Sequence, residues 1–420
     1  MIIVKDLHKS FEDNQVLKGV SYHIHPGEKI VVVGPSGSGK STFLRCLNLL
    51  ERPTSGEIWF DGQNITDPKI DINKVRQHMG MVFQHFNLFN NLTVKDNITL
   101  GPVKQKLMTK EEAEAEAMRL LKLVNLEEKA DWLVENIRKN EWIQDGDKGW
   151  FNGYYDNHGR KVEYSAVSDE TDNKAGAECN TRMMLTGQVF AVMSGTATEE
   201  QIQAICRSAD AYLYDRKAGG YRLNTDFKEE KFDLGRMFGF AYGEKENGAV
   251  FSHMAVMYAN ALYKTGHAKE GYKVLQTLLD TAMDFERSKM YPGIPEYFDN
   301  QGRGLYAYLT GAASWYMLTM ITEVFGVKGQ LGDMVIAPAL MPEQYDQEGK
   351  ASLKIEFAGR KFSIHIFNRE KKEWNKVQIK EAFCDGTLLS AEGGRQARLK
   401  RSEIEKLTLE KVHEINIILN

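Results

Sequence analysis

Hydrophobic and polar residues follow different patterns along the chain, and one change of pattern falls near residue 130. Before it, short β-branched runs alternate with turns, and five of the nine prolines lie between Pro26 and Pro102. After it come segments with apolar residues at helical spacing, such as MMLTGQVFAVM and SHMAVMYANALYKTG, separated by aromatic and amide-rich loops. After Pro338 the segment SLKIEFAGRKFSIHIFNRE (residues 352–370) predicts two strands joined by Ala-Gly-Arg. The pattern therefore predicts a multidomain chain with an α/β part, a helical part and a β-rich part.

The composition of the chain indicates which broad class of protein it belongs to. The 420 residues are 42% hydrophobic and 27% charged, with a formal net charge of −4, so neither nucleic acid nor an anionic membrane is an expected partner. The four cysteines are scattered along the chain without the spacing of metal ligands, and we interpret them as reduced thiols. The most apolar long segment, Tyr308–Val327, contains Thr, Ser, Gly and Glu, which favours a core helix over a membrane span. We expect a cytoplasmic, soluble chain.

One short stretch carries specific chemistry. EKIVVVGPSGSGKSTFLRCLNLL (residues 28–50) predicts a buried strand at Ile30–Val33, a glycine-rich turn, and a helix over Ser41–Leu50. It matches every fixed position of G-x-x-x-x-G-K-S/T, in which backbone amides surround phosphates, the lysine (Lys40) reaches the β and γ phosphates, and the serine hydroxyl (Ser41) binds Mg²⁺. The predicted nucleotide-binding set is Gly34, Pro35, Ser36, Gly37, Ser38, Gly39, Lys40, Ser41 and Thr42.

Two histidine signals have an alternative, structural interpretation. His23 and His25 fall on one face of a predicted strand and could bind a metal, but no third ligand lies near them in the sequence. We therefore expect an exposed strand face there. His85 is expected to be a loop residue rather than a catalyst.

Residues 1–131 resemble the ATPase subunits of ABC transporters, especially those of polar amino-acid importers. IIVKDLHKSFEDNQVLKGVSYHIHPGEKIVVVGPSGSGKSTFLRCLNLLERPTSGEIWFDGQNI follows that family nearly position by position, and MVFQHFNLFNNLTVKDNI resembles its Q-loop region. The resemblance implies that Phe11 stacks on adenine and that Gln84 contacts Mg²⁺ and the attacking water. It also implies ATP and Mg²⁺ as cofactors, and a membrane permease subunit as a partner of the Gln84 loop.

The resemblance stops after Asp131. No LSGGQ-like signature motif follows, no run of four apolar residues leads into Asp-Glu, and the switch histidine has no candidate. In that family two subunits sandwich ATP, each presenting its signature motif to the other's phosphate loop. The fold expected for residues 1–131 is therefore an incomplete P-loop α/β ATPase half, with a phosphate loop that lacks its partner motif.

Residues 132–420 resemble the C-terminal portion of the inverting cellobiose and chitobiose phosphorylases, formerly grouped with glycosyltransferase family 36. The segments that carry the resemblance include GWFNGYYD, GGYRLNTDF, FGFAYGEKENGAVFSHMAVMYANAL, YPGIPEYFDNQGRGLYAYLTGAASW and TEVFGVKGQLGDMVIAPAL. The resemblance implies part of an (α/α)6 barrel over residues 132–331 and a C-terminal β-sandwich cap over residues 332–420.

The same resemblance assigns a phosphate and sugar site. His253 matches the family's phosphate-binding histidine, and Thr310 with Gly311 matches the Thr-Gly pair that also binds phosphate. An imidazole, a hydroxyl and a backbone amide are consistent with an oxyanion cradle. Tyr242, Glu246 and Asn247 lie in the loop that resembles the sugar-binding wall. The implied ligands are inorganic phosphate and a disaccharide or sugar 1-phosphate.

The departure from this second family concerns its catalytic acid. In the family an aspartate of a D-W-N-D-like motif protonates the glycosidic oxygen while phosphate attacks the anomeric carbon. That motif precedes GWFNGYYD by tens of residues, and here those positions are occupied by the ATPase-like part. The phosphate-clamping arginine and the N-terminal sandwich of the family are missing as well. Asp145 and Asp147 lie past the place of the acid, and neither is assigned that role.

The chain joins a truncated ATPase-like part to a truncated phosphorylase-like part, and three hypotheses can explain what this protein is. It is a nucleotide-binding protein that retains ATP affinity, a carbohydrate-active enzyme with a passive ATPase-like N-terminus, or an artificial fusion of two gene fragments. We favour the third as the origin, because the join falls inside a domain on both sides and no Gly/Ser/Pro linker separates Asp131 from Trp132. Both halves are then expected to be catalytically incomplete.

Overall fold

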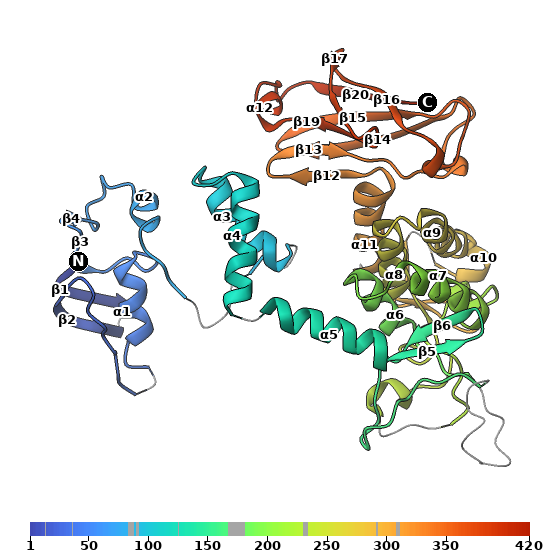
Figure 1. Ribbon diagram of the computed structural model, residues 1–420, viewed down its shortest axis with the longest axis horizontal. Helices are drawn as coiled ribbons and strands as arrows, with labels where there is room; N and C mark the ends of the chain where they lie inside the picture. Colours follow the sequence, from blue (N-terminus) through green and yellow to red (C-terminus); the bar gives the residue numbers. More distant parts are fainter. Residues whose placement is uncertain are drawn as a thin grey trace. The chain divides into compact units, whose positions relative to one another are not determined.

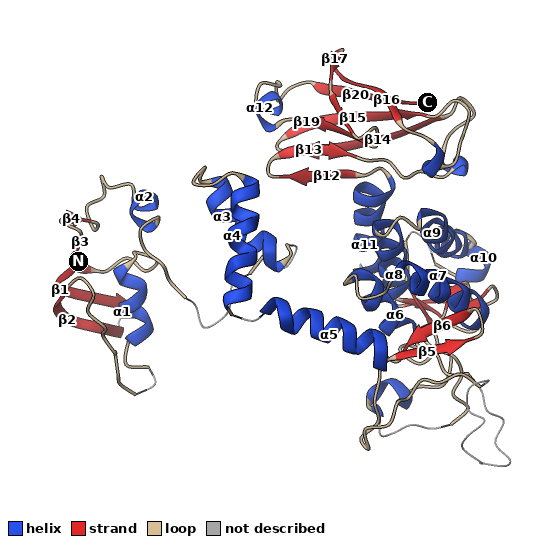
Figure 2. Ribbon diagram, viewed as in Figure 1, coloured by secondary structure: helices blue, strands red, loops and turns tan. Residues whose placement is uncertain are grey.

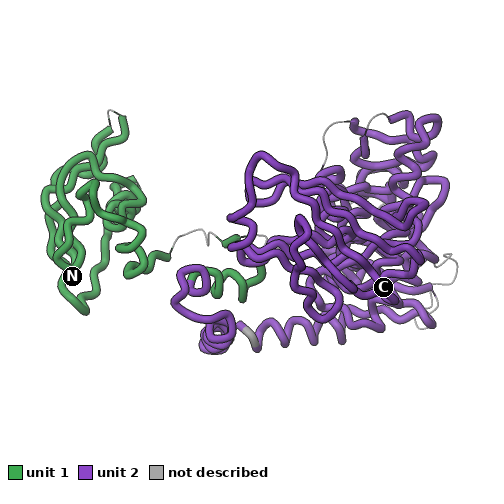
Figure 3. Tube along the Cα trace, turned by 90° about the horizontal axis from the view of Figure 1, so that it is seen from above, with its two compact units in different colours: residues 1–101 green, residues 102–420 purple. Residues whose placement is uncertain are grey.

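The structure is a computed structural model. It describes residues 1–420 except residues 13, 36, 83–87, 90–91, 125, 167–180, 230–233, 291–292 and 308–310. The described chain divides into two compact units, Met1–Gly101 and Pro102–Asn420, drawn in different colours in Figure 3. The boundaries expected from the sequence, at residues 131/132 and 331/332, remain predictions.

The first unit contains a four-stranded antiparallel sheet in the order β2-β1-β3-β4. Its elements are β1 (Ile2–Phe11), β2 (Asn14–Ile24), α1 (Lys40–Leu47), β3 (Ser55–Phe60), β4 (Gln63–Asn64), α2 (Ile72–Arg76) and α3 (Val94–Lys104), which continues into the second unit. The helix expected after the phosphate loop, over Ser41–Leu50, is present as α1 and ends at Leu47. Apolar residues of this unit form one small core: Val4, Leu7, Leu17, Cys46, Leu49, Ile58, Ile65 and Val75.

The predicted buried strand at Ile30–Val33 is wrong for this structure. Residues 30–35 have no strand assignment, and the side chains of Val31 and Val33 are 82% and 83% exposed. An apolar β-branched run is buried only where other strands pair with it and elements cover its two faces. None of the strands in the described part of the first unit pairs with this run, so it stays in the solvent.

A helix crosses the predicted join between the two parts. α5 (Leu126–Asn140) follows α4 (Lys110–Leu123), which begins with a capping box formed by Thr109 and Glu112. The sequence LEEKADWLVENIRKN contains no Gly or Pro on either side of Asp131, so nothing in it interrupts a helix there. Within the second unit, the C-terminal part of α5 is fixed to the loop between α6 and α7, where Arg138 Nε donates to the carbonyl of Thr196 over 2.5 Å.

The second unit contains a helical region (Figure 1). Its helices are α6 (Leu185–Met193), α7 (Glu199–Ser208), α8 (Ser252–Lys264), α9 (Ala268–Met283), α10 (Phe285–Ser288) and α11 (Gly311–Thr319). Short strands connect them: β5 (Trp142–Asp145), β6 (Lys148–Phe151), β7 (Tyr214–Asp215), β8 (Gly220–Tyr221), β9 (Val250–Phe251), β10 (Tyr297–Phe298) and β11 (Gly304–Leu305). α8 packs against α6, α9 and α11, and three of its nine buried residues are alanines (Ala255, Ala259 and Ala261), whose small side chains permit close helix approach. The arrangement of these helices in an (α/α)6 barrel remains a prediction.

The chain after α11 is rich in strands (Figure 2). We call residues 327–420 the C-terminal β region. Its sheets have the orders β12-β13-β19-β18 and β14-β15-β20-β16-β17. The strands are β12 (Val327–Gln330), β13 (Asp333–Ile336), β14 (Lys350–Phe357), β15 (Arg360–Phe367), β16 (Ile379–Cys384), β17 (Thr387–Leu388), β18 (Ser390–Glu392), β19 (Gln396–Leu399) and β20 (Val412–Leu419), with the short helix α12 (Arg401–Ile404) before β20.

The two-strand pattern predicted for residues 352–370 is confirmed by β14 and β15, which pair antiparallel from Lys350–Phe367 to Phe357–Arg360. One continuous apolar core joins the C-terminal β region to the helices, with Leu262 of α8, Val327 of β12 and Ile364 of β15 all buried in it. In the described part of the chain, no helix is long and apolar enough to cross a membrane.

The exposed run in the first unit makes a direct prediction. Replacing Val31 and Val33 together by lysine should reduce aggregation of the full chain and leave the free energy of unfolding within about 0.5 kcal/mol, because both side chains already face solvent. Light scattering and urea unfolding measure the two effects. The matched control is Val4→Lys, which places a charge at a position only 2% exposed and should unfold the first unit. If the double variant unfolds as Val4→Lys does, the run is a buried strand after all.

Candidate functional site

The phosphate-loop residues form a tight turn before α1. Gly37 and Gly39 have φ angles of 81° and 86°, a region that side-chain-bearing residues rarely adopt, and Gly39 is the N-cap of α1. No side chain caps this helix end, so its first backbone amides remain available as donors. A Cβ on Gly39 would lie 2.8 Å from Cγ1 of Val16, so glycine is needed here for space as well as for conformation.

Lys40 lies within this turn. Its Nζ donates to the carbonyl oxygens of Gly34 and Pro35, each over 2.7 Å, and is 3.4 Å from Oγ of Ser38. The ammonium is therefore held by two carbonyl oxygens of the loop that leads into α1, and the first amides of α1 add partial positive charge at the same end of the helix. Ser41 is exposed and Thr42 is half-buried at the start of α1. Ser36 and Gln84 lie outside the described residues, and so does His85.

Phe11 is not brought to this turn. A pocket of about 590 Å³ lies beside the phosphate loop between β2 and the exposed run, and Phe11 does not line it. The Phe11 ring is at the end of β1, where the Nζ of Lys9 lies 4.6 Å from its centroid. The adenine-stacking role of Phe11 therefore remains a prediction. His23 and His25 lie with ring centroids 4.1 Å apart, and no cluster of three metal-ligating residues occurs among the described residues.

His253 and Gly311 meet in the second unit. His253 is in the first turn of α8 and Gly311 begins α11, which packs against α8. A Cβ on Gly311 would lie 3.2 Å from both Cε1 and Nδ1 of His253, so the imidazole rests directly on the glycine backbone. Trp315, one turn further along α11, has its ring centroid 5.8 Å from that of the imidazole. Thr310 lies outside the described residues.

The imidazole of His253 has an unused nitrogen. Its Nε2 is buried and has no hydrogen-bond partner among the described protein groups, as is also true of Oγ of Ser252. Burial lowers the pKa of His253, because desolvation disfavours the charged ring. A negatively charged group placed beside this free nitrogen would favour the protonated ring, against the effect of burial.

Two of the three residues expected in a sugar-binding wall are used within the protein. Asn247 Nδ2 donates to the carbonyl of Phe240 over 2.8 Å, and its Oδ1 accepts from Nδ2 of Asn224 over 3.1 Å. The Tyr242 hydroxyl donates to the carbonyl of Asn224 over 3.2 Å. These hydrogen bonds hold the loop that contains Tyr242 and Asn247 in place, so both side chains stabilise the protein itself.

Glu246 differs from its two neighbours. Its Oε1 is 3.5 Å from Nη2 of Arg236, while its Oε2 is buried without a partner among the described groups. Of the three wall residues, Glu246 is therefore the one with an acceptor to spare for a ligand hydroxyl.

Sequence reasoning missed two residues that hold this loop. Arg222 Nη1 donates to the carbonyl of Gly248 over 2.6 Å while its Nη2 pairs with Oδ2 of Asp215 over 2.8 Å. Asn224 Oδ1 accepts from the amide of Gly248 over 2.7 Å. Both side chains are buried. The segment GGYRLNTDF contains them, but their role depends on contacts with residues more than twenty positions away.

The aspartates near the expected place of the acid are engaged elsewhere. Asp145 is buried and accepts a hydrogen bond from the Tyr212 hydroxyl. Burial and this carboxylate raise the pKa of Tyr212 to about 12. Asp147 is exposed and lies 3.5 Å from both Lys148 and Arg207. Neither geometry presents a free proton donor.

Glu163 is a buried carboxyl that sequence reasoning also missed. Its Oε1 accepts from the amide of Gly153 and its Oε2 from the amide of Met184, both over 2.7 Å. Burial raises the pKa of Glu163 to about 8, and the two amides only partly oppose this. Its carboxyl therefore connects the loop after β6 to the start of α6, and burial favours the protonated form.

Two family models match the chain. The ABC transporter model matches residues 17–140, and the model of the glycosyl hydrolase 94 superfamily, catalytic domain, matches residues 107–326. The matches overlap at residues 107–140, which include α4 and α5. Together they fit a chimera of an amino-acid ABC transporter ATP-binding subunit and a phosphorylase-type domain.

The ATP-binding proteins of several amino-acid transporters are similar to about a third of this chain. The arginine transport ATP-binding protein ArtM of Bacillus subtilis is 53% identical over 129 residues, which are 31% of this chain and 54% of that protein. The glutamine transport ATP-binding protein GlnQ of Escherichia coli is 48% identical over 130 residues, with the same two shares. The chain spans about half the length of these relatives. A solved dimeric ATP-binding cassette bound to ADP and phosphate is 36% identical, covers 30% of this chain and 57% of that chain, and has a TM-score of 0.28.

The buried carboxyl predicts a pH dependence. The folded pKa of Glu163, about 8, is above the ordinary value of 4.5, so the folded state binds a proton that the unfolded state has released. Its contribution to the free energy of unfolding is complete below pH 4.5 and is lost as the pH rises to about 8, at no more than ~1.4 kcal/mol per pH unit.

Urea unfolding of the full chain at several pH values between 4.5 and 8 measures this slope, with buried Trp150 as the probe of the second unit. Glu163→Gln should flatten it, while Glu135→Gln, at an exposed position of α5, should leave it unchanged. An equal slope in wild type and Glu163→Gln would show that the carboxyl is ionised in the folded state.

Proposed function

The chain belongs to the glycosyl hydrolase 94 superfamily, and from this premise we propose that it is an anion-binding chimera that completes the catalytic site of neither parent. Each part keeps one phosphate cradle: the loop before α1 and the contact between His253 and Gly311. The second cradle carries the proposal: the His253 imidazole packs against the Gly311 backbone through Cε1 and Nδ1, and its Nε2 is buried without a partner among the described groups.

The first cradle fits a nucleotide phosphate. The free amides at the start of α1 and the ammonium of Lys40 supply donors and positive charge without any carboxylate among the loop residues 34–42. In this proposal Ser41 and Gln84 hold the Mg²⁺ ion of a bound ATP. The curated relatives are named for arginine and glutamine transport, so the proposed parent is an amino-acid importer whose permease contacted the Gln84 loop.

ATP turnover is not proposed for this site. Hydrolysis in an ABC dimer requires a catalytic glutamate and the signature motif of the second subunit, and the 420 residues contain neither pattern. Binding is expected to be weak as well, because the apolar run that precedes the loop is exposed and pairs with no strand in the described part of the first unit.

The second cradle fits inorganic phosphate. A phosphate oxygen beside His253 would provide the acceptor that Nε2 lacks and would favour its protonated form, against the effect of burial on its pKa. The backbone amide of Gly311 and the hydroxyl of Thr310 complete the proposed cradle. Glu246, with its unpartnered Oε2, is the residue proposed to bind a sugar hydroxyl.

Phosphorolysis needs a proton donor within reach of the leaving oxygen, and positioned proton transfer contributes roughly 10²–10⁴-fold. Asp145 is bound to Tyr212 and Asp147 faces two cations, so neither supplies that proton. The proposed second site therefore holds phosphate and sugar without making them react. The alternative, an active carbohydrate enzyme with a passive N-terminal part, requires an acid elsewhere in the chain.

Nucleotide binding depends on Lys40 in this account. Lys40→Ala should abolish the binding of Mg·ATP by the full chain, because the charge beside the phosphates is lost. Equilibrium dialysis with labelled ATP measures it. The matched control is Lys18→Ala, an exposed lysine of β2 outside the loop, which should bind as wild type does. Equal binding by wild type and Lys40→Ala would reject the site.

Sugar chemistry should be absent. We expect no release of sugar 1-phosphate from cellobiose or chitobiose with phosphate, measured by coupled assay or anion-exchange chromatography. Phosphate itself should still bind, and His253→Ala should weaken that binding. Clear phosphorolysis by the chain would contradict the proposal, and Asp145→Asn and Asp147→Asn would then identify the acid.

A further inference from the structure

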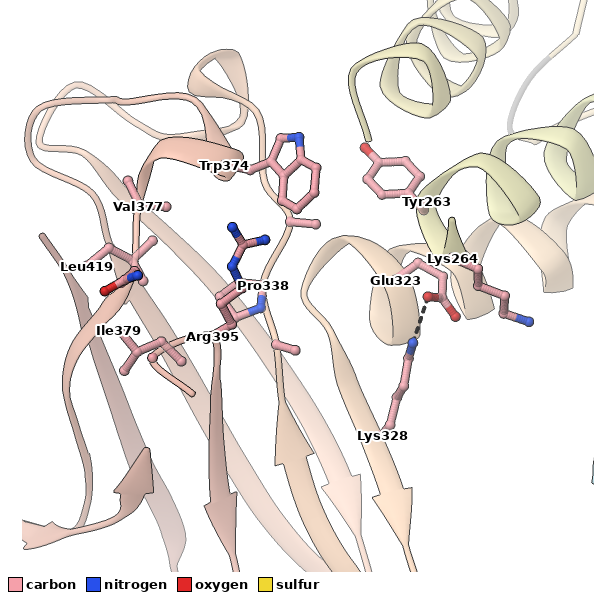
Figure 4. Close-up of a pocket in the computed structure, with 14 residues that line it drawn as sticks. Tyr263, Lys264, Glu323, Lys328, Pro338, Trp374, Val377, Ile379, Arg395 and Leu419 are labelled. Carbon is pink, nitrogen blue, oxygen red and sulfur yellow. Dashed lines mark hydrogen bonds and ion pairs between the residues drawn. The ribbon is translucent and has the colours of Figure 1, made fainter. Parts of the chain in front are cut away.

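A small pocket lies where the end of α8 meets the C-terminal β region. Its volume is about 200 Å³, below the roughly 300–1,000 Å³ typical of sites for drug-sized ligands, so it suits one small molecule. It is separate from the His253 site, because His253 begins α8 and this pocket lies at residues 263–264, about 15 Å further along the helix. The lining residues that matter below are Tyr263, Glu323, Lys328, Trp374, Gln378 and Arg395 (Figure 4).

Trp374 provides the pocket with a flat apolar surface. It belongs to the 3-10 turn Trp374–Lys376, is half-buried, and packs against the core that joins the helices and the C-terminal β region. Its Cη2 would lie 3.9 Å from a Cβ built on Gly266, in the turn between α8 and α9. A ring held in place in this way is suited to the C–H face of a sugar.

The polar groups of the pocket carry an excess of positive charge. Its charged residues are one glutamate, Glu323, and three cations. Glu323 is nearly buried and pairs with Lys328 over 2.7 Å, so this pair is internally neutral. Lys264 points away from the other residues in Figure 4. The remaining cation, Arg395, is the one available to a ligand.

Arg395 lies beside the tryptophan. Its guanidinium carbon is 6.0 Å from the Trp374 ring centroid, the residue is exposed, and its side chain makes no hydrogen bond or ion pair to another group in the described part of the chain. A guanidinium offers a fork of donors that matches phosphate or carboxylate oxygens. Ring and guanidinium together therefore favour a ligand with an apolar ring face next to an anionic group.

The hydroxyl of Tyr263 is a second, independent indication that the pocket binds a ligand. The residue is only 6% exposed, and its hydroxyl is buried without a hydrogen-bond partner among the described groups. Burial raises the pKa of Tyr263, so this hydroxyl stays protonated and remains a donor. Figure 4 shows the hydroxyl end of the ring turned to the side where Trp374 lies. A ligand oxygen entering beside Trp374 would satisfy it.

We propose that this pocket binds a phosphorylated hexose, with the sugar ring on Trp374, the phosphate on Arg395 and a ring hydroxyl near Tyr263. The Glu323–Lys328 pair and Gln378 are the remaining groups for sugar hydroxyls. The site does not depend on the function proposed for His253, because no residue is shared between the two.

Calorimetric titration of the full chain with glucose 6-phosphate tests the proposal, with glucose and inorganic phosphate as separate probes. Glucose 6-phosphate should bind more tightly than either. Arg395→Gln should weaken its binding at least about tenfold, because a charge-assisted hydrogen bond is lost. Tyr263→Phe, which removes only the unpartnered hydroxyl, should weaken it about threefold or more.

Arg369→Gln, at an exposed arginine that does not line the pocket, is the matched control and should bind as wild type does. Arg395 is also exposed, so its replacement should leave the fold intact. The same titration with His253→Ala separates the two sites, and binding should persist. Loss of binding with His253→Ala, equal binding of phosphate or glucose alone, or unchanged affinity in Arg395→Gln would overturn the proposal.

Discussion

A β-strand in the middle of a sheet is stable only when other strands and covering elements accompany it, and this requirement governs the first unit. Ile30–Val33 has the apolar, β-branched composition of such a strand, yet it is unpaired and exposed in the described structure. The antiparallel sheet β2-β1-β3-β4 combines the local pairs β1-β2 and β3-β4 with a pairing of β1 to the distant β3, in which Ile2 lies opposite Phe60, and it keeps its own small core. The phosphate loop then depends on this exposed run on one side and on α1 on the other.

In the second unit, more of the apolar surface of the helices and strands is covered by neighbouring elements. Its helices and the C-terminal β region share one continuous core, so most of the apolar side chains are covered. The exceptions include Phe190 on α6 and Met317 and Leu318 on α11, which are about half or more exposed. The expectation of a buried helix over Tyr308–Val327 is therefore met on only one face of α11. The shared core includes residues of α8, which carries His253, and Trp374 packs against it, so both the His253–Gly311 contact and the Trp374 pocket lie on packed elements.

Sequence predicted the features that depend on neighbouring residues. The alternation at residues 352–370 gave β14 and β15, and the glycine spacing before Lys40 gave the turn at the N-terminus of α1. The pairing of His253 with Gly311 came from the family resemblance, since 58 positions separate them, and the packing of α8 on α11 brings them together.

The rest depends on distant contacts that no local pattern specifies. The exposure of Ile30–Val33 follows from strands that do not pair with it, which its own composition does not reveal. The occupied amide of Asn247 depends on Asn224, and the raised pKa of Glu163 depends on its burial against Gly153 and Met184. The pocket at Trp374 likewise requires α8 to meet the C-terminal β region.

Hydrogen exchange of the backbone amides in the full chain tests the central claim most directly. The account predicts that the amides of residues 30–34 exchange within about tenfold of the unstructured rate, because they have no ladder partner, while those of β14 and β15 exchange slowly. Protection at residues 30–34 equal to that of the paired strand β1 would contradict it, and would show that the chain supplies the neighbours of this strand.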